Sequence, residues 1–152
     1  MKYWIMKSEP SEFSIDDLES VGTEPWDGIR NYQVRNMFRD KFQVGDRAFF
    51  YHSNSTEIGV VGEMEVVSKA YPDPTQFEAK NAHYDPKSSQ DNPRWLLVDV
   101  KFVEKFPRTV TLQELKESKY FATLPLVQKG NRLSVVEIEK KHYQRIKDLA
   151  YQ

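Results

Sequence analysis

Residues 94–106 read RWLLVDVKFVEKF, and this stretch carries the strongest strand pattern in the chain. Within it, the apolar residues Val98 and Val100 alternate with the charged residues Asp99 and Lys101. Successive side chains of a strand point to opposite faces, so a period of two puts the valines on one face and the charges on the other. The stretch therefore predicts a long strand with one face in a core and the other toward solvent.

Further elements follow from shorter patterns of the same kind. Strands are expected at Tyr3–Met6, Arg47–Ser53, Ile58–Lys69 and Leu133–Ile138. Helices are expected over Ser14–Glu19, from Asn31 to about Lys41, over Thr111–Ser118 and over Glu139–Ala150. The last helix should bury Tyr143, Ile146 and Leu149, which recur at helical spacing. Gly59 and Gly62 inside a predicted strand indicate a bulge or a close approach of two backbones.

Five or six strands joined by short helices place the chain in the α+β class. The expected architecture is a small mixed β-barrel with short helices packed around it. The 152 residues contain no internal repeat and no linker-like segment, so one domain spanning residues 1–152 is expected.

One connection is unusually long. The segment Tyr71–Pro93 is polar and contains four prolines. Loops of this length in compact domains are either functional or flexible. We therefore expect residues 72–92 to be mobile without a ligand and to close near a binding site.

Composition limits the classes of function. The chain has no Cys, so it has no disulfide, no thiolate metal ligand and no thiol nucleophile. No apolar run is long enough to cross a membrane, and a monomeric intracellular protein is expected, cytoplasmic in a bacterium or nuclear in a eukaryote. The formal net charge is −1, so any contact with nucleic acid must come from a local patch.

Residues 26–36, WDGIRNYQVRN, form the densest candidate binding stretch. Gly28 lets the backbone or a ligand approach closely, and Asn31 can cap the helix that follows. An aromatic plane, free N–H groups of a first helical turn, and the guanidinium groups of Arg30 and Arg35 suit a nucleobase with its phosphate. The competing interpretation is that Trp26 fills the core and both arginines are solvated.

The usual catalytic patterns are missing. His52, His83 and His142 lack the i+3 or i+4 partners of a metal site, and there is no phosphate loop and no Gly-x-Ser-x-Gly motif. His83 is followed closely by Asp85, but residues this close in sequence rarely act as a base and its orienting group. We therefore expect no enzyme activity, no metal and no cofactor.

Four motifs in order along the chain resemble those of the EVE domain family. They are WIMKSEP at residues 4–10, WDGIRNYQVRN at residues 26–36, FFYHSN at residues 49–54 and RLSV at residues 132–135. The resemblance runs nearly end to end. It implies a PUA-like fold, a β-barrel with helices packed around it, which agrees with the strand count.

The resemblance also implies a site. EVE domains are related to YTH domains, in which a strand ending in Lys-Ser and a Trp before a helix help to build a pocket for methylated adenine. Lys7, Ser8 and Trp26 look like the counterparts, but Glu9 stands where those domains have an Asn. A carboxylate accepts hydrogen bonds and suits a base edge that donates them, such as the exocyclic amine of cytosine. EVE domains are similar to modules implicated in recognising modified bases, including modified cytosine in DNA.

The resulting hypothesis is a non-catalytic module that holds one modified base of DNA or RNA in an aromatic-walled pocket. Trp26 should stack on the base, at the pocket, partly exposed and outside the core. The proposed base-binding residues are Ser8, Glu9, Trp26, Asp27, Gly28, Asn31, Tyr32, His52 and Ser53. The proposed backbone or phosphate contacts are Lys7, Arg30, Arg35, Lys87 and Arg132.

Other interpretations remain open at this level. Tyr32 and His52 equally fit core residues with satisfied polar tips, Ser53 a turn, and Lys87 a solvated surface. A sensor of a free nucleotide or another small anionic ligand agrees better with the near-zero net charge. An enzyme acting on a modified base is the third alternative.

Overall fold

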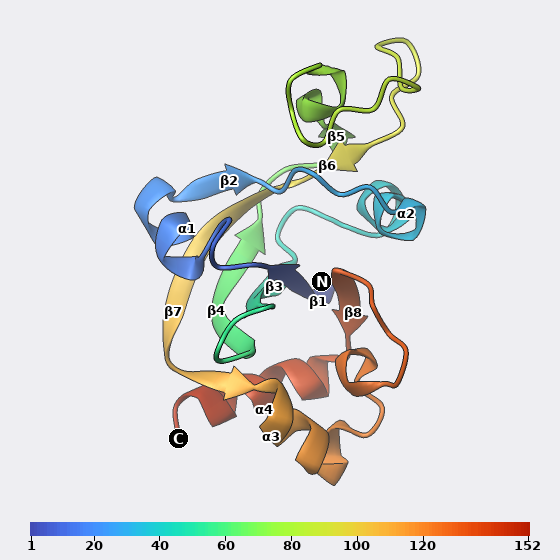
Figure 1. Cartoon of the computed structure of the whole chain (residues 1–152). Coiled ribbons are helices and arrows are strands. Elements are labelled where there is room, and N and C mark those ends of the chain that lie inside the picture. Colours follow the sequence, from blue (N-terminus) through green and yellow to red (C-terminus); the bar gives the residue numbers. More distant parts are fainter.

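The computed structural model describes residues 1–152, and its centre is a mixed sheet of six strands curled into a half-barrel (Figure 1). The strand order is β2-β7-β4-β3-β1-β8. These strands span Tyr3–Ser8 (β1), Thr23–Pro25 (β2), Arg47–His52 (β3), Gly59–Val66 (β4), Asp99–Thr111 (β7) and Val135–Ile138 (β8). A second sheet pairs β5 (Tyr71–Pro72) with β6 (Leu96–Leu97). The predicted α+β architecture is confirmed.

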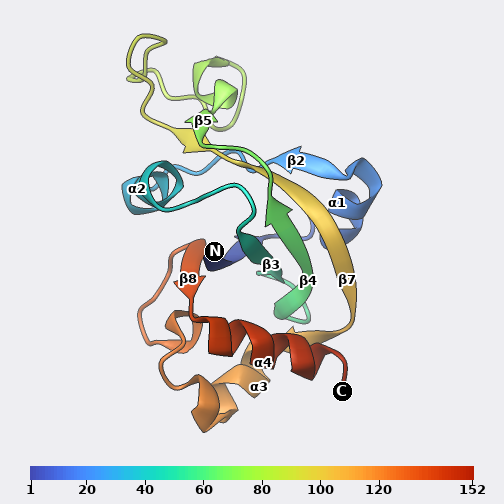
Figure 2. The same ribbon diagram turned by 180° about the vertical axis from the view of Figure 1, so that it is seen from behind.

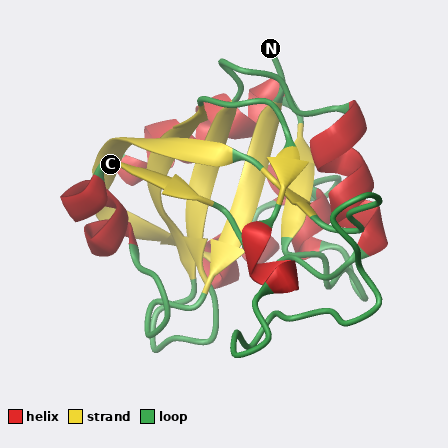
Figure 3. Cartoon of the chain, turned by 90° about the horizontal axis from the view of Figure 1, so that it is seen from above, coloured by secondary structure: helices red, strands yellow, loops and turns green.

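Helices and short 3-10 turns cover the sheet from several sides (Figures 2 and 3). The α-helices span Ile15–Val21 (α1), Tyr32–Asp40 (α2), Leu112–Glu117 (α3) and Lys140–Ala150 (α4). The 3-10 turns span Pro74–Phe77 (η1), Lys119–Phe121 (η2) and Pro125–Val127 (η3). Ser14 and Thr111 begin α1 and α3 with capping boxes, as their sequences predict. No helix has the length and apolar character needed to cross a bilayer.

Strand β1 is paired on both sides, parallel to β3 and antiparallel to β8. A parallel pair needs a long crossover, and α1, β2 and α2 lie between β1 and β3 in the chain. Because β1 and β3 run in the same direction, their carboxyl ends lie together. Ser8 stands opposite His52 in the register of the pair.

The predicted strand over residues 94–106 is wrong in its bounds, because the chain breaks at Val98 and then continues in β7 as far as Thr111. Leu96, Leu97 and Val98 are three consecutive apolar residues, so the period of two holds only after them. Before the break the chain pairs with β5, and after it with β4 and β2. The carbonyl of Val98 accepts a hydrogen bond of 2.9 Å from the backbone N–H of Trp26.

The two glycines of β4 allow the close backbone approach that the sequence predicts. A Cβ on Gly62 would lie 2.6 Å from the carbonyl oxygen of Glu104, and one on Gly59 would overlap that of Val110. The β4–β7 register shifts between Val60 and Gly62, which confirms a bulge.

Two apolar clusters fill the two sides of the sheet. One lies under α1 and α2, and the other under α3 and α4. Trp4 anchors the first, since its indole N–H donates to the buried Asp46 carboxylate at 3.0 Å. In α4, Tyr143 and Ile146 are buried as predicted. Leu149 is only half-buried, and Ala150 beside it is fully buried instead.

The segment after β5 is more ordered than its composition suggests. Asp73, Thr75 and Gln76 are buried. The Gln76 amide donates to the carbonyls of Asp73 (2.7 Å) and Trp95 (2.8 Å) and accepts from the Trp95 N–H (3.1 Å). These bonds tie the two ends of the segment together, and it projects from the end of the half-barrel near β2 (Figure 1).

Candidate functional site

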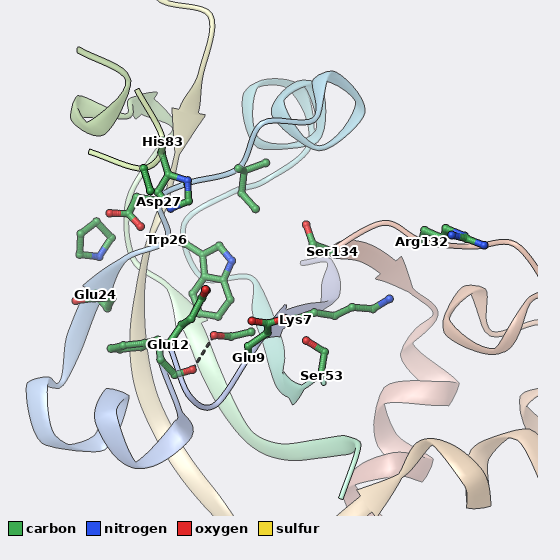
Figure 4. A pocket seen from close by; sticks show the side chains of 16 residues that line it. Lys7, Glu9, Glu12, Glu24, Trp26, Asp27, Ser53, His83, Arg132 and Ser134 are labelled. Atoms are coloured by element: carbon green, nitrogen blue, oxygen red, sulfur yellow. Dashed lines mark hydrogen bonds between the residues drawn. The ribbon is translucent and has the colours of Figure 1, made fainter. Parts of the chain in front are cut away.

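A pocket of about 670 Å³ opens where the ends of β1, β2 and β3 lie beside the segment that leads into β8 (Figure 4). Predicted site residues that line it are Lys7, Ser8, Glu9, Trp26, Asp27, Gly28, Ser53 and Arg132. The lining is completed by Glu12, Phe13, Glu24, Pro25, Ile29, Ala82, His83 and Ser134. This volume lies within the range of small-molecule sites, roughly 300–1,000 Å³.

Trp26 lies in the middle of this group (Figure 4), yet it is only 6% exposed and packs in the core. Its ring meets Phe50 edge-on, with the centroids 5.4 Å apart and the planes at 81°. The prediction that Trp26 is partly exposed and outside the core is therefore wrong. The backbone bond to Val98 continues the strand pairing of β2 and draws the residue inward. Trp26 forms part of the core and part of the pocket wall at once.

The indole N–H of Trp26 has no hydrogen-bond partner in the protein, and its nitrogen is not sealed off from the pocket. Trp4 provides a contrast, because its indole N–H is buried and bonded to Asp46. The Trp26 N–H is accessible, so it can donate to water or to a ligand. The pocket therefore offers an unused donor on an otherwise apolar ring.

Four carboxylates line the pocket: those of Glu12, Glu24 and Asp27 lie to one side of Trp26, and that of Glu9 lies beside Lys7 (Figure 4). One oxygen of Glu9 accepts a hydrogen bond of 3.1 Å from the side-chain amide of Asn54. Asn54 has a positive φ of 50°, a conformation that Asn tolerates better than most residues. Asn54, in the loop after β3, thus fixes one oxygen of the Glu9 carboxylate. The other oxygen forms no hydrogen bond within the protein, and the residue lines the pocket.

Two of these carboxyl groups titrate abnormally. Partial burial, together with the charges of Asp27 and Asp17, raises the pKa of Glu24. Partial burial and the charge of Asp73 raise the pKa of Asp27, against smaller opposing effects of His83 and Arg30. Negative charge in this part of the pocket is therefore poorly compensated by the protein.

Cationic side chains lie on the opposite side of Trp26 (Figure 4). Lys7 extends over the ring of Tyr51, with its Nζ 5.8 Å from the ring centroid, and burial lowers the pKa of its ammonium group. Arg132 is exposed. Lys7 and Arg132 thus lie on the side of the indole where Glu9 is the nearby carboxylate (Figure 4).

Backbone hydrogen bonds hold the pocket wall together. The N–H of Lys7 donates to the carbonyl of Ser134 at 2.8 Å, and the N–H of Ser53 donates to the carbonyl of Ser8 at 3.0 Å. The Ser8 hydroxyl donates to the carbonyl of Phe13 at 2.6 Å. Ser8 therefore fixes the turn that carries Glu9, in addition to lining the pocket.

The long segment after β5 reaches the pocket through Ala82 and His83. The ring of His83 lies against Gly28, where a Cβ would be only 2.7 Å from the histidine Nε2. Gly28 also has a positive φ of 81°, so both backbone and space favour glycine. The long segment therefore already lies against the pocket in the absence of a ligand. Its expected mobility and its closure stay predictions.

Asp73 connects the stretch around Gly28 to the long segment after β5. Its buried carboxylate accepts from the Gly28 N–H (2.8 Å), Arg30 Nη1 (3.0 Å), and the Thr75 N–H (2.8 Å) and hydroxyl (2.6 Å). Burial alone raises the pKa of Asp73, but these bonds outweigh it and hold the pKa below its usual range. Arg30 further donates twice to the carbonyl of His83, at 2.9 and 2.6 Å. The guanidinium of Arg30 thus braces the loop and lies outside the pocket lining, and its expected phosphate contact stays a prediction.

Three more predicted residues belong to helix α2 and lie outside the pocket lining. Asn31 caps the helix, with its side-chain oxygen accepting from the Val34 N–H at 3.0 Å. The ring of Tyr32 packs against that of Trp95, with the centroids 4.7 Å apart and the planes tilted by 31°. Arg35 covers the Tyr32 ring at 5.0 Å and donates to the carbonyl of Arg94 at 2.9 Å. Tyr32 and Arg35 thus fasten α2 to the residues that precede β6. The expected base contacts of Asn31 and Tyr32 and the expected phosphate contact of Arg35 stay predictions.

His52 and Lys87 are also not part of the lining. The Nε2 of His52 accepts a hydrogen bond of 3.1 Å from the N–H of Ile15, and burial lowers the pKa of its ring. The neutral His52 ring therefore accepts a hydrogen bond from the first residue of α1. Lys87 is exposed in the long segment.

The model of the EVE domain matches residues 2–149. The chain belongs to the EVE domain family. Among curated proteins, human thymocyte nuclear protein 1 is 50% identical over 125 residues, covering 75% of this chain and 55% of that protein. This chain therefore spans about half the length of the curated relatives of this name.

Solved EVE domain structures have the same fold. A Pseudomonas putida protein has a TM-score of 0.93 at 44% identity, covering 97% of this chain and 99% of its own. The human THYN1 protein, in complex with DNA containing 5-methylcytosine, has a TM-score of 0.90 at 40% identity, covering 100% of this chain and 99% of that one.

Sequence reasoning missed several residues of this EVE domain pocket. Glu24 precedes Trp26 by two residues, and residues two apart in a strand point to the same face. This spacing could have placed Glu24 beside Trp26. Ser134 stood inside a motif already noticed. Glu12 and His83 gave no local signal, because they reach the pocket only through the turn after β1 and the long segment after β5.

Proposed function

We propose that this EVE domain binds nucleic acid and holds one modified base in the pocket beside Trp26. The observation that carries the proposal is the unpartnered indole N–H of Trp26 on the wall of a base-sized pocket. A base offers what that wall lacks, namely a flat surface together with ring or carbonyl acceptors. The human protein solved with 5-methylcytosine DNA supports the choice of modified cytosine as the first probe.

The proposed contacts follow from the charged side chains that line the pocket. Lys7 and Arg132 face the sugar-phosphate chain, and Glu9 accepts from the exocyclic amine of the base. The base has to leave its stack to enter, which costs a few kcal/mol and is easiest in single-stranded or damaged DNA. The domain acts by binding and not by catalysis, and no group of three His, Cys, Asp or Glu side chains is arranged to hold a metal ion.

Fluorescence anisotropy tests the proposal directly. The probes are one labelled oligonucleotide with a central cytosine, the same strand with 5-methylcytosine, and the free 5-methyldeoxycytidine nucleoside. We expect the methylated strand to bind more tightly than both others, and its affinity to fall with salt. Equal affinities for the two strands would refute recognition of this modified base, and tightest binding of the free nucleoside would favour a small-molecule sensor.

Two lysines provide a matched comparison for the phosphate contacts. Lys7→Gln removes a cation from the pocket, whereas Lys87→Gln removes an exposed cation outside the lining. Lys7→Gln should weaken binding to all sequences alike and lower the salt slope by roughly one. Lys87→Gln should leave both quantities unchanged, and an equal effect of the two variants would show that binding is non-specific.

A further inference from the structure

Asn54 is the only residue other than glycine that has a positive φ, at 50°. The left-handed region is unfavourable for residues with a side chain, although Asn adopts it more readily than most. Such strain persists where the surrounding structure enforces it, and it is common at ligand-binding sites. Asn54 is exposed, so core packing does not account for its conformation. Its side chain forms one hydrogen bond in the protein, from the amide Nδ2 to Oε1 of Glu9 at 3.1 Å.

The parallel pairing of β1 and β3 brings these two residues together. The carboxyl ends of the two strands lie side by side, and the N–H of Ser53 donates to the carbonyl of Ser8 at 3.0 Å. Glu9 and Asn54 are the next residues of each chain segment (Figure 4 shows Glu9 and Ser53). The carbonyl of Glu9 also accepts two N–H groups of the turn that follows, at 2.9 and 3.0 Å. Backbone bonds therefore hold both partners of the side-chain contact in place.

The direction of this bond decides which oxygen of Glu9 is available. Asn54 contributes an amide donor and a carboxylate only accepts, so Oε1 is occupied. Oε2 forms no hydrogen bond within the protein, and Glu9 lines the pocket. An acceptor fixed in place binds a group that donates and rejects one that accepts, because the second leaves both acceptors unpaired. The free oxygen therefore favours a base edge that carries an N–H group over one that carries a carbonyl.

We propose that Asn54 is a positioning residue of the pocket, which holds Glu9 so that the pocket selects a pyrimidine with an amine at C4 over one with a carbonyl there. This inference rests on the proposed function and names the edge of the base that is recognised. 5-Methylcytosine and thymine form an isosteric pair for it. They share their shape and their methyl group, and they differ only along the pairing edge.

Four single-stranded oligonucleotides test the edge and the methyl group separately. Their central base is cytosine, 5-methylcytosine, uracil or thymine. We expect 5-methylcytosine to bind roughly 10- to 150-fold more tightly than thymine, the range for a hydrogen bond to a charged group, and cytosine to exceed uracil in the same way. Equal affinities of 5-methylcytosine and thymine would overturn the inference.

The methyl group tests the proposed function in the same data. If 5-methylcytosine exceeds cytosine but equals thymine, only the inference falls. If 5-methylcytosine equals cytosine and still exceeds thymine, recognition of the methyl group falls and selection by the edge stands. If all four strands bind equally, both fall.

Asn54→Gly tests the positioning role, because glycine keeps the positive φ and removes only the amide. The ligand must then immobilise the Glu9 side chain, so the preference for 5-methylcytosine over thymine should fall roughly two- to twelvefold. A merely structural role of the loop would weaken both strands alike, and that unchanged ratio would overturn the inference.

Ser55→Ala is the matched control in the same loop. It removes a hydroxyl that accepts from the N–H of Glu57 at 3.2 Å, and it leaves the contact between Asn54 and Glu9 intact. It should leave the ratio unchanged. An equal loss of preference in Ser55→Ala and Asn54→Gly would overturn the inference, since any disturbance of the loop would then have the same effect.

Glu9→Gln tests the direction of the contact. Asn54 would hold the new side-chain carbonyl, which leaves the new NH₂ group to the pocket as a donor. The preference should therefore reverse toward thymine, whose carbonyl accepts. Addition of Asn54→Gly to this variant should bring the ratio near one, because the amide can then turn either way. A Glu9→Gln variant that prefers 5-methylcytosine by the wild-type factor would overturn the inference.

Discussion

Replacement of Trp26 by Ala should damage both the fold and the site, because the residue belongs to both. The side chain is 6% exposed and packs edge-on against Phe50. Truncation of a buried Trp costs about 3–5 kcal/mol, a large part of the roughly 5–15 kcal/mol that stabilises an average protein. For a chain of this size each kcal/mol lowers Tm by roughly 2–4 °C. We therefore expect a fall of roughly 6–20 °C in thermal unfolding.

Binding has to be measured on a variant that still folds. Trp26→Phe keeps an aromatic ring but removes the indole N–H. Loss of one hydrogen bond to the base costs about 0.5–1.5 kcal/mol, which corresponds to a weakening of roughly two- to twelvefold. The assay is anisotropy with the modified strand, at a temperature where circular dichroism shows the variant fully folded.

Trp4→Ala serves as the control for the fold alone. Trp4 is fully buried outside the pocket lining, and its loss leaves the buried Asp46 carboxylate without one of its donors. It should destabilise at least as much as Trp26→Ala, while its folded fraction binds normally. If Trp26→Ala unfolds at the wild-type temperature, the ring does not support the core. If Trp26→Phe binds as tightly as wild type, the free N–H has no role in binding.

Three further predictions follow from the loop and the carboxylates. Gly28→Ala should destabilise by about 1 kcal/mol or more in urea unfolding, since φ is 81° and a Cβ would lie 2.7 Å from the ring of His83; an unchanged midpoint would contradict this. Because the pKa of Asp27 is raised in the folded state, that state binds more protons between the ordinary carboxyl pKa and the raised one, so the stability contribution of Asp27 falls as pH rises through this window. Asp27→Asn should therefore raise Tm at neutral pH relative to wild type and not below about pH 4, and an equal difference at both pH values would count against the assignment. Amides of residues 79–92 should exchange faster with solvent than those of β7, and equal protection would show that the loop is rigid.

The sequence predicted the elements whose patterns are local. Alternation in β7 and the cap at Asn31 were readable because each is complete within a few residues. The break at Val98 was not, because only pairing with a distant strand decides where an apolar run changes sheets.

The site residues were likewise predictable where the signal is local and not where it depends on distant parts of the chain. Trp26 and Glu9 were identified because they stand in recognisable motifs. Arg30 and Tyr32 were assigned to the ligand because an isolated motif does not reveal competing partners. Those partners, Asp73 and Trp95, lie in the long segment after β5, and only the folded chain brings them to the motif.

The pairing of β1 with β8 has a consequence for how the chain is made. Tyr3 lies opposite Ile138, so β1 is synthesised well before β8, the strand that covers its edge. Contacts between such distant segments also slow folding, because a long loop must close first. Until Val135 has been added, the nascent chain lacks the partner strand beside β1. In that interval the open edge of β1 and the incomplete pocket wall are exposed to other chains.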